Sequence, residues 1–194
     1  MRDIILDAAE RRFADAGFAG TSVRDIASDA GLKNQASLYH HFEHKQEIYE
    51  AVLRRAIDAL VPLWERDQKG VAAGIDDVVE HLAAHPHSAR LIERAGLEDD
   101  LFVREAVSRL LRPLFDAGVQ VLADAGGQWR EDELPLLAAG LYHLIFGYFA
   151  NASLLQAVMR EDPRAPEMLA RQRRFLTIAI ARLLGADERV EDDT

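Results

Sequence analysis

The feature that most constrains the fold is the helical spacing of apolar residues along almost the whole chain. Ile5, Ala9 and Phe13, for example, lie at positions i, i+4 and i+8, which places them on one face of a helix. Alternation of apolar and polar residues, the pattern of a half-buried strand, is almost absent. Proline and glycine fall between the periodic blocks, where they end or bend helices. The sequence therefore predicts an all-α protein.

Two short helices are predicted at the N-terminus. The first spans residues 3–16 and ends at Gly17, because glycine readily takes the backbone conformation that follows a helix. The second follows Thr21 and Ser22, whose hydroxyls can cap its first turn, with Asp25 where a capping box has its acid. We therefore expect this second helix to begin directly after the two hydroxyl residues.

A third short helix is predicted after a sharp turn at Gly31. Asn34 is a good N-cap for it, and it runs to about Phe42, with Leu38 and Phe42 on its inward face. His41 borders that face, so it is either a packed histidine or a contact to the backbone of a partner. Leu38 and Phe42 are expected to be core residues.

Longer helices are predicted in the rest of the chain. One runs from Lys45 to about Gln68, and Pro62 is expected to kink it or to end its regular part. Further helices are expected at residues 75–85, 87–96, 99–124, 131–160 and 166–185. Because the handover between domains is expected inside the long helix, we divide the chain into domains at residues 1–47 and 48–194.

Composition and charge narrow the classes of function. The chain has no cysteine, which excludes disulfides, thiolate catalysis and cysteine-bound metals. Its formal net charge is −10, and residues 1–50 hold nine acidic residues against six basic ones. A nucleic acid would therefore have to bind a local basic surface. Because no apolar run is long enough to span a bilayer, we expect a cytoplasmic protein with no membrane partner.

The layout of the first 50 residues is that of a helix-turn-helix, with two short helices joined by a glycine-containing turn and the longer helix of residues 3–16 in front of them. In such a motif the second short helix, here the one after Asn34, enters the major groove of DNA. Thr21 and Ser22, at a helix start, can offer hydroxyl and N–H groups to a phosphate. Tyr39 and Lys45 can contact the DNA backbone on the other side. These four residues would set the position of the protein on the duplex.

Other side chains of the third helix suit contacts to base edges. Gln35, Ser37 and His40 can form hydrogen bonds with bases, and the methyl group of Ala36 can pack on a thymine methyl. The alternative is an ordinary solvated helix face on a helical bundle.

Residues 4–50 carry a pattern that resembles a known family. The stretches ILDAAERRFADAGFAGTSVRDIASDAG and SLYHHFEHKQEIYEAV resemble the N-terminal DNA-binding domain of TetR/AcrR-family transcriptional regulators, over about a quarter of the chain. The resemblance implies a three-helix helix-turn-helix domain followed by a helical ligand-binding and dimerisation domain. It also implies a repressor that binds a palindromic operator in double-stranded DNA as a homodimer and releases it when a small-molecule effector binds.

Two positions depart from the family pattern. The turn after the Ala-Gly pair is one residue longer, with Lys33 as the extra residue. His44 stands where the family has a small N-cap residue, so we expect the following helix to be capped less well. The predicted DNA contacts are Thr21, Ser22, Arg24, Lys33, Asn34, Gln35, Ala36, Ser37, Tyr39, His40, His44 and Lys45.

The C-terminal part is expected to hold the effector and to form the dimer. Helices near residues 134–159 and 167–184 are apolar enough to form a self-complementary interface. His143 lies in apolar surroundings, either as a core histidine or as a group that orients a ligand. The apolar lining favours a hydrophobic or aromatic effector. The candidate effector-binding residues are Trp64, Phe102, Phe115, Tyr142, His143 and Phe146.

A histidine cluster raises an alternative from another class. His81 and His85 are four residues apart on one helix face, and His87 follows closely, so the three could share a metal ion. In the metalloprotease motif HExxH, however, a glutamate stands where this chain has Leu82. We predict neither a metal site nor a cofactor nor an enzyme. The alternatives are a metal-dependent helical enzyme and a helical interaction module that binds no DNA.

Overall fold

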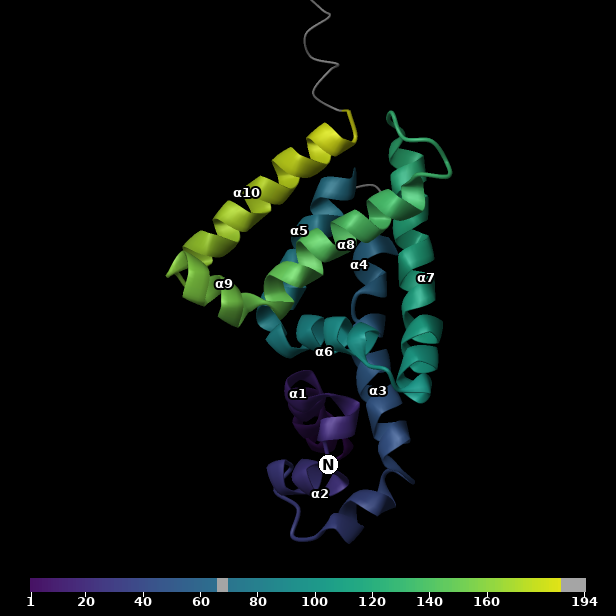
Figure 1. The fold of residues 1–194 in the computed structure, drawn as a ribbon, viewed down its shortest axis with the longest axis vertical. Coiled ribbons are helices and arrows are strands. Elements are labelled where there is room, and N and C mark those ends of the chain that lie inside the picture. Colours follow the sequence, from purple (N-terminus) through teal and green to yellow (C-terminus); the bar gives the residue numbers. More distant parts are fainter. Residues whose placement is uncertain (66–69, 186–194) are drawn as a thin grey trace, which may run out of the picture. The chain divides into compact units, whose positions relative to one another are not determined.

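The computed structural model describes residues 1–65 and 70–185, and for residues 64, 65 and 70–73 it describes the backbone alone (Figure 1). No strand occurs in these described parts, so the all-α prediction is confirmed. The helices are α1 (Arg2–Gly20), α2 (Val23–Asp29), the 3₁₀-helix η1 (Gln35–His40), α3 (Lys45–Asp58), α4 (Val61–Glu65), α5 (Gly70–Ala84), α6 (Pro86–Leu97), α7 (Leu101–Ala125), α8 (Leu134–Ala150), α9 (Ala152–Met159) and α10 (Pro166–Leu183).

The chain packs as two compact units. Of the described residues, the first comprises 1–59 and 85–113, and the second comprises 60–65, 70–84 and 114–185. The first unit therefore contains α6 and the first half of α7 in addition to the N-terminal helices. The predicted division into a DNA-binding domain, residues 1–47, and a ligand-binding domain, residues 48–194, concerns function and stays a prediction.

Helix α1 has a break close to its end. It extends to Gly20, beyond the predicted end of the helix, but Gly17 leaves the helical conformation with φ 74° and ψ 179°. The predicted break at Gly17 is therefore present, and the chain makes one more turn after it. Because φ is positive here, glycine is the residue that takes this conformation without strain.

Helix α2 begins and ends as its sequence predicts. Ser22 and Asp25 form a complete capping box, in which the Ser22 hydroxyl accepts from the Asp25 N–H and the Asp25 carboxylate accepts from the Ser22 N–H. At the other end Gly31 has φ 70°, and the Leu32 N–H donates to the Ala27 carbonyl at 2.9 Å. This is a Schellman ending, which turns the chain sharply toward η1.

The third helix is a 3₁₀-helix rather than the expected α-helix. Asn34 caps it as predicted, since its Oδ1 accepts from the Ser37 N–H at 2.9 Å. The His41 N–H donates to the carbonyl of Leu38, three residues earlier, at 2.9 Å. With three residues per turn, side chains three apart lie above one another, so the exposed face differs from that of an α-helix.

The burial of this region follows the sequence prediction. Leu38 and Phe42 are both buried, which confirms them as core residues. His41 is exposed, so it is not the packed histidine that one alternative required.

Four aromatic rings form the centre of the first unit. Tyr49 makes edge contacts with Phe13 and Phe18 at centroid distances of 4.8 and 5.0 Å, and Phe102 lies 5.4 Å from Phe18. The buried Tyr49 hydroxyl has no hydrogen-bond partner among the described residues, and burial raises its pKa. Phe102, predicted as an effector contact, is therefore part of this aromatic cluster.

Polar contacts tie α1 to both α3 and α6 within the same unit. Arg55 binds Asp7 and Glu10, each at 2.7 Å, and Glu10 also accepts from the buried Ser88 hydroxyl at 2.9 Å. Arg90 pairs with Asp15 at 2.9 Å. Helix α6 is thus an integral part of the first unit.

The long helix predicted from residue 45 to 68 is interrupted. Helix α3 ends at Asp58, and α4 begins at Val61 with Pro62 in its first turn. Proline is tolerated there because the first N–H groups of a helix have no partner inside it. Pro62 therefore starts a new helix instead of kinking a continuous one, and residues 66–68 of the predicted helix lie outside the described part.

In the second unit α5 packs against α8 and α10. The helix predicted over residues 131–160 is wrong in extent, because α8 and α9 meet at Asn151 with a bend of 75°. The Asn151 side-chain amide donates to the Gly147 carbonyl at 2.9 Å, and the same carbonyl accepts the Asn151 N–H at 3.1 Å, where α8 ends.

No single helix among the described residues is long and apolar enough to cross a membrane. Helices α8 and α9 meet the test of length and composition only as a bent pair.

Candidate nucleic-acid interface

The predicted DNA contacts lie on three neighbouring pieces of the first unit: the start of α2, the turn leading into η1, and the start of α3. Helix α2 packs against η1, and Lys45 of α3 reaches the carbonyl of Thr21. The exposed members of the set are Ser22, Arg24, Lys33, Asn34, Gln35, Ala36, Tyr39, His40 and His44. The structure therefore brings most of the predicted contacts to one part of the surface.

Two of the most important side chains are hydrogen-bonded to each other. The Gln35 amide Nε2 donates to the Tyr39 hydroxyl at 3.1 Å, and both side chains are exposed. Because the bond uses one amide proton and one hydroxyl lone pair, the amide oxygen and the hydroxyl proton can still meet a partner. The residue predicted to contact bases and the one predicted to contact phosphate are thus oriented together.

Asn34 and Ser37 hold the start of η1. The Asn34 Oδ1 accepts from the Ser37 hydroxyl at 3.0 Å as well as from its N–H. The Ser37 hydroxyl therefore donates within the protein, and only its lone pairs can meet a base. In this geometry Ser37 can meet a base only as a hydrogen-bond acceptor.

Thr21 faces inward. Its side chain is 2% exposed, and its hydroxyl donates to the Gly17 carbonyl at 2.8 Å. This geometry disagrees with the predicted phosphate contact, since the hydroxyl closes the end of α1 instead of lying at the surface. Ser22, the next residue, is exposed, and its hydroxyl donates to Asp25 at 2.6 Å.

Lys45 is half-buried and serves the same region. Its ammonium donates to the carbonyls of Phe18 and Thr21, at 2.8 and 3.1 Å, and lies 4.1 Å from the centre of the Phe18 ring. Carbonyls at a helix end lack partners inside the helix, and a cation there is favourable. In this arrangement Lys45 joins α3 to the end of α1, and a phosphate would have to compete with two carbonyls for it.

His44 caps α3, contrary to the expectation of a weak cap. Its Nδ1 accepts from the Glu47 N–H at 3.1 Å, and the Glu47 carboxylate accepts from the Glu43 N–H at 2.6 Å. The imidazole nitrogen thus accepts the N–H that the side chain of a small polar N-cap residue usually accepts. Only Nε2 of His44 is then left for a contact to a partner.

The two acidic residues of α2, Asp25 and Asp29, are both paired within the protein, although they lie beside the predicted DNA contacts. Arg12 binds Asp29 with its guanidinium at 2.5 Å, which lowers the pKa of that carboxyl. The Ser22 hydroxyl and N–H lower the pKa of Asp25. Because both acids of α2 have partners, the neighbouring Arg24 and Lys33 are the residues left to face a polyanion.

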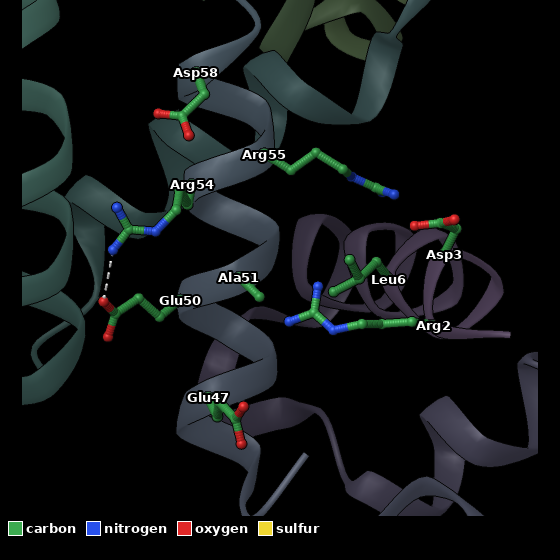
Figure 2. A pocket seen from close by; sticks show the side chains of 9 residues that line it. All are labelled: Arg2, Asp3, Leu6, Glu47, Glu50, Ala51, Arg54, Arg55 and Asp58. Atoms are coloured by element: carbon green, nitrogen blue, oxygen red, sulfur yellow. Dashed lines mark hydrogen bonds and ion pairs between the residues drawn. The ribbon is translucent and has the colours of Figure 1, made fainter. Parts of the chain in front are cut away.

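A groove of about 490 Å³ lies between α1 and α3, and Figure 2 shows its lining. Both acidic and basic side chains line it, and Arg54 pairs with Glu50 at 3.1 Å. Arg2 lies with its guanidinium 4.7 Å from the Phe42 ring. The lining residues are Arg2, Asp3, Leu6, Glu47, Glu50, Ala51, Arg54, Arg55 and Asp58. None of them is a predicted contact, and their mixed charge favours no class of ligand.

The candidate effector residues are divided between the two units, and three of them lie together on α8. The rings of Tyr142 and Phe146, both in α8, stack on each other with their centroids 4.7 Å apart. The His143 ring centroid lies 5.0 Å from that of Tyr142. His143 is exposed, so the prediction of a core histidine is wrong. Phe115 is half-buried in the second unit, whereas Phe102 belongs to the first. The Trp64 side chain lies outside the described residues.

The alternative of a metal ion shared by His81, His85 and His87 has no support in the described geometry. Within residues 1–65 and 70–185, no group of three or more histidine, aspartate or glutamate side chains is arranged to hold a metal ion.

The sequence does not predict one contact of this region, the hydrogen bond between Phe18 and Glu98. The Phe18 N–H donates to the carboxylate Oε1 of Glu98 at 2.7 Å, although 80 positions separate the two residues. The glycine break before Phe18 indicates that this N–H needs an acceptor from elsewhere, but no local pattern identifies which residue supplies it.

Comparison with known proteins supports a regulatory domain at the N-terminus. Residues 5–52 match the family model of bacterial regulatory proteins, tetR family. The HTH-type transcriptional repressor KstR2 of Mycolicibacterium smegmatis is 49% identical over 65 residues, which cover 34% of this chain and 31% of that protein. The icaADBC negative transcriptional regulator IcaR of Staphylococcus aureus is 35% identical over 82 residues, 42% of this chain and 44% of that protein. These matches span less than half of either relative.

Solved structures share the fold over nearly the whole chain. A transcriptional regulator from Aquifex aeolicus has a TM-score of 0.66 at 18% identity, covering 92% of this chain and 98% of that one. The fatty acid degradation regulator FadR from Bacillus halodurans has a TM-score of 0.68 at 15% identity, covering 91% and 97%. Such identities show the fold alone. Residues 5–52 thus match the tetR family of bacterial regulatory proteins, and the chain as a whole shares the fold of the solved regulators.

Proposed function

We propose that the chain is a transcriptional repressor, not an enzyme, that binds a palindromic operator in double-stranded DNA as a homodimer and releases it when a small molecule binds. The observation that carries this proposal is the surface of η1. Its Gln35, Ala36, Tyr39 and His40 are exposed while Leu38 is fully buried, so one face packs and the other is open to a partner. That division is what a recognition helix needs.

The exposed residues divide into two roles. Gln35, Ala36 and His40 contact base edges, and Tyr39 contacts the DNA backbone and orients Gln35. Arg24 and Lys33 supply positive charge beside the phosphates. Asn34 and Ser37 mainly stabilise the start of η1.

The homodimer is supported by apolar side chains that the second unit leaves uncovered. Val158 is 71% exposed and Phe175 is 51% exposed, which is unusual for such residues in a monomer. The exposed apolar residues of α8, α9 and α10 are Leu136, Leu144, Leu154, Val158, Met159, Phe175 and Ile178. A two-fold dimer can read two half-sites about 34 to 36 Å apart, which one recognition helix cannot do.

The effector is proposed to be hydrophobic or aromatic and to bind in the second unit, beside the stacked Tyr142 and Phe146. The protein then acts in the cytoplasm, where both DNA and the effector are available.

A selection experiment tests DNA binding. Duplexes selected from a random-sequence pool by the wild-type protein are titrated by fluorescence anisotropy at several salt concentrations. We expect affinity to fall steeply with salt, because bound phosphates release counterions. Gln35→Ala should relax the base preference at one position, whereas Tyr39→Phe should weaken binding to all sequences. Gln46→Ala, which removes another exposed amide, is the control. Binding without salt dependence would contradict the proposal.

Analytical ultracentrifugation tests the dimer. Val158→Asp and Phe175→Asp should shift the protein to a monomer and weaken binding to the selected duplex. Leu97→Asp is the matched control, because Leu97 is 84% exposed but lies in the first unit. A wild-type monomer, or dimers in all variants, would remove this interface from the proposal.

A further inference from the structure

The end of α1 is bound by a residue from the connection between α6 and α7. Because Gly17 is not helical, the Phe18 N–H lies outside the regular hydrogen-bond pattern, and Glu98 accepts it at 2.7 Å. A Cβ at position 17 would lie 2.5 Å from the Glu98 Oε1 and 2.8 Å from the Arg94 Nε. The carboxylate therefore occupies a space that exists only because residue 17 is glycine.

Phe18 is held by other elements of the first unit as well. Its carbonyl accepts from Lys45 of α3, and its ring packs against Tyr49 and Phe102. The N–H, the carbonyl and the ring of this one residue thus each contact a different part of the unit. Phe18 has little freedom to move as long as Glu98 and Lys45 are in place.

This residue lies directly before the helix-turn-helix. Only Ala19, Gly20 and Thr21 separate it from Ser22, the N-cap of α2. Thr21 is fixed at both ends, since its hydroxyl donates to the Gly17 carbonyl and its own carbonyl accepts from Lys45. A displacement at Phe18 is therefore passed on to α2 and to η1, which packs against α2.

We propose that Glu98 is a positioning residue for DNA binding. It touches no DNA, but it sets the place of α2 and η1 on the first unit through the Phe18 N–H. This inference rests on the proposed function. It extends the DNA-binding body to the α6–α7 connection, far outside residues 5–52.

Three substitutions of Glu98 separate its possible contributions. Glu98→Gln keeps an acceptor oxygen at the same reach, Glu98→Asp keeps the charge but is one methylene shorter, and Glu98→Ala removes both. Glu105→Ala is the matched control, because Glu105 is an exposed carboxylate in the part of α7 that belongs to the same unit. Each variant is compared with wild type by thermal unfolding and by DNA binding.

Binding is measured on a duplex selected by the wild-type protein and on a scrambled duplex of the same composition, each at several salt concentrations. For Glu98→Ala and Glu98→Asp we expect the preference for the selected duplex to fall about fivefold to tenfold and the salt dependence to become shallower, as contacts to bases and phosphates are lost. Glu98→Gln and Glu105→Ala should keep both. A purely structural role would lower the melting temperature and leave preference and salt dependence unchanged.

The outcomes are distinct. If the wild-type protein prefers a selected duplex but all folded Glu98 variants match it, the positioning role is wrong and the proposed function stands. If the wild-type protein selects no duplex, the proposed function is wrong and the positioning role falls with it. Should Glu98→Ala not fold, the comparison of Glu98→Asp with Glu98→Gln still decides, because they differ in reach and charge in opposite ways.

Discussion

The contacts of Lys45 predict a large loss of stability when this lysine is replaced by alanine. Its ammonium donates to two carbonyls, at 2.8 and 3.1 Å, and lies over the Phe18 ring. A hydrogen bond from a charged donor contributes about 1.5 to 3 kcal/mol. A cation over an aromatic face adds about 0.5 to 1 kcal/mol. Because one ammonium makes all three contacts and water reaches the vacated carbonyls, the contributions do not add fully. We expect Lys45→Ala to lower the free energy of unfolding by about 2 to 4 kcal/mol.

Urea unfolding of the DNA-free protein, followed by circular dichroism, measures this loss. Lys33→Ala is the control, since Lys33 is exposed at the turn and surface substitutions usually change stability by less than about 0.5 kcal/mol. Hydrogen exchange should also show faster exchange in residues 17–22, the segment that Lys45 holds.

The opposite result would refute this account of Lys45. If Lys45→Ala is within about 0.5 kcal/mol of wild type, the ammonium does not stabilise the end of α1. If the same variant also shows a shallower salt dependence of DNA binding, Lys45 reaches outward to a phosphate, as its place in the sequence predicts.

Three further outcomes are expected. Gly17→Ala should destabilise the protein by about 1 to 3 kcal/mol in urea unfolding, since φ 74° and ψ 179° lie in a region that is almost exclusive to glycine. Gly118→Ala, at an open helical position, is the control and should be neutral or stabilising. Equal effects of the two substitutions would contradict backbone strain at position 17. Thr21→Val should lower the free energy of unfolding by about 1 to 3 kcal/mol, because the Gly17 carbonyl loses the hydroxyl that donates to it. Thr21→Ser keeps a hydroxyl and should retain most of the stability. Equal melting curves for the two variants would contradict the inward hydrogen bond. The pKa of Asp25 is lowered by the Ser22 hydroxyl and N–H, so its stabilising effect is present above the ordinary value of 3.8 and is lost as the pH falls through the lowered pKa. In Ser22→Ala the Asp25 carboxyl should titrate closer to 3.8 by NMR, and an unchanged titration would disprove that cause.

Much of the first unit follows from local sequence signals. The capping box of Ser22 and Asp25, the Asn34 cap, the turn at Gly31 and the burial of Leu38 depend on residues no more than about four positions apart. Such signals are visible in the sequence because the interacting groups stay neighbours whatever the rest of the chain does.

Other local predictions, those for the end of α8 and the start of α3, were wrong. The apolar run over residues 131–160 indicates one helix, but the chain bends by 75° at Asn151, whose side chain and N–H both donate to the Gly147 carbonyl. His44 was expected to be a poor cap, yet its ring nitrogen accepts the Glu47 N–H. Neither outcome follows from helical periodicity, because each involves a hydrogen bond between a side chain and the backbone.

The sequence by itself determined the all-helical class, the order of the short N-terminal helices, and the pattern that places residues 5–52 in the tetR family. The tertiary structure alone decided which way the polar side chains point. Thr21 and Lys45 face the end of α1 instead of the solvent, and Glu98 reaches Phe18 across 80 positions. The sequence shows which groups can form hydrogen bonds, but the partner of each is chosen by packing, which brings distant segments such as those of Phe18 and Glu98 together.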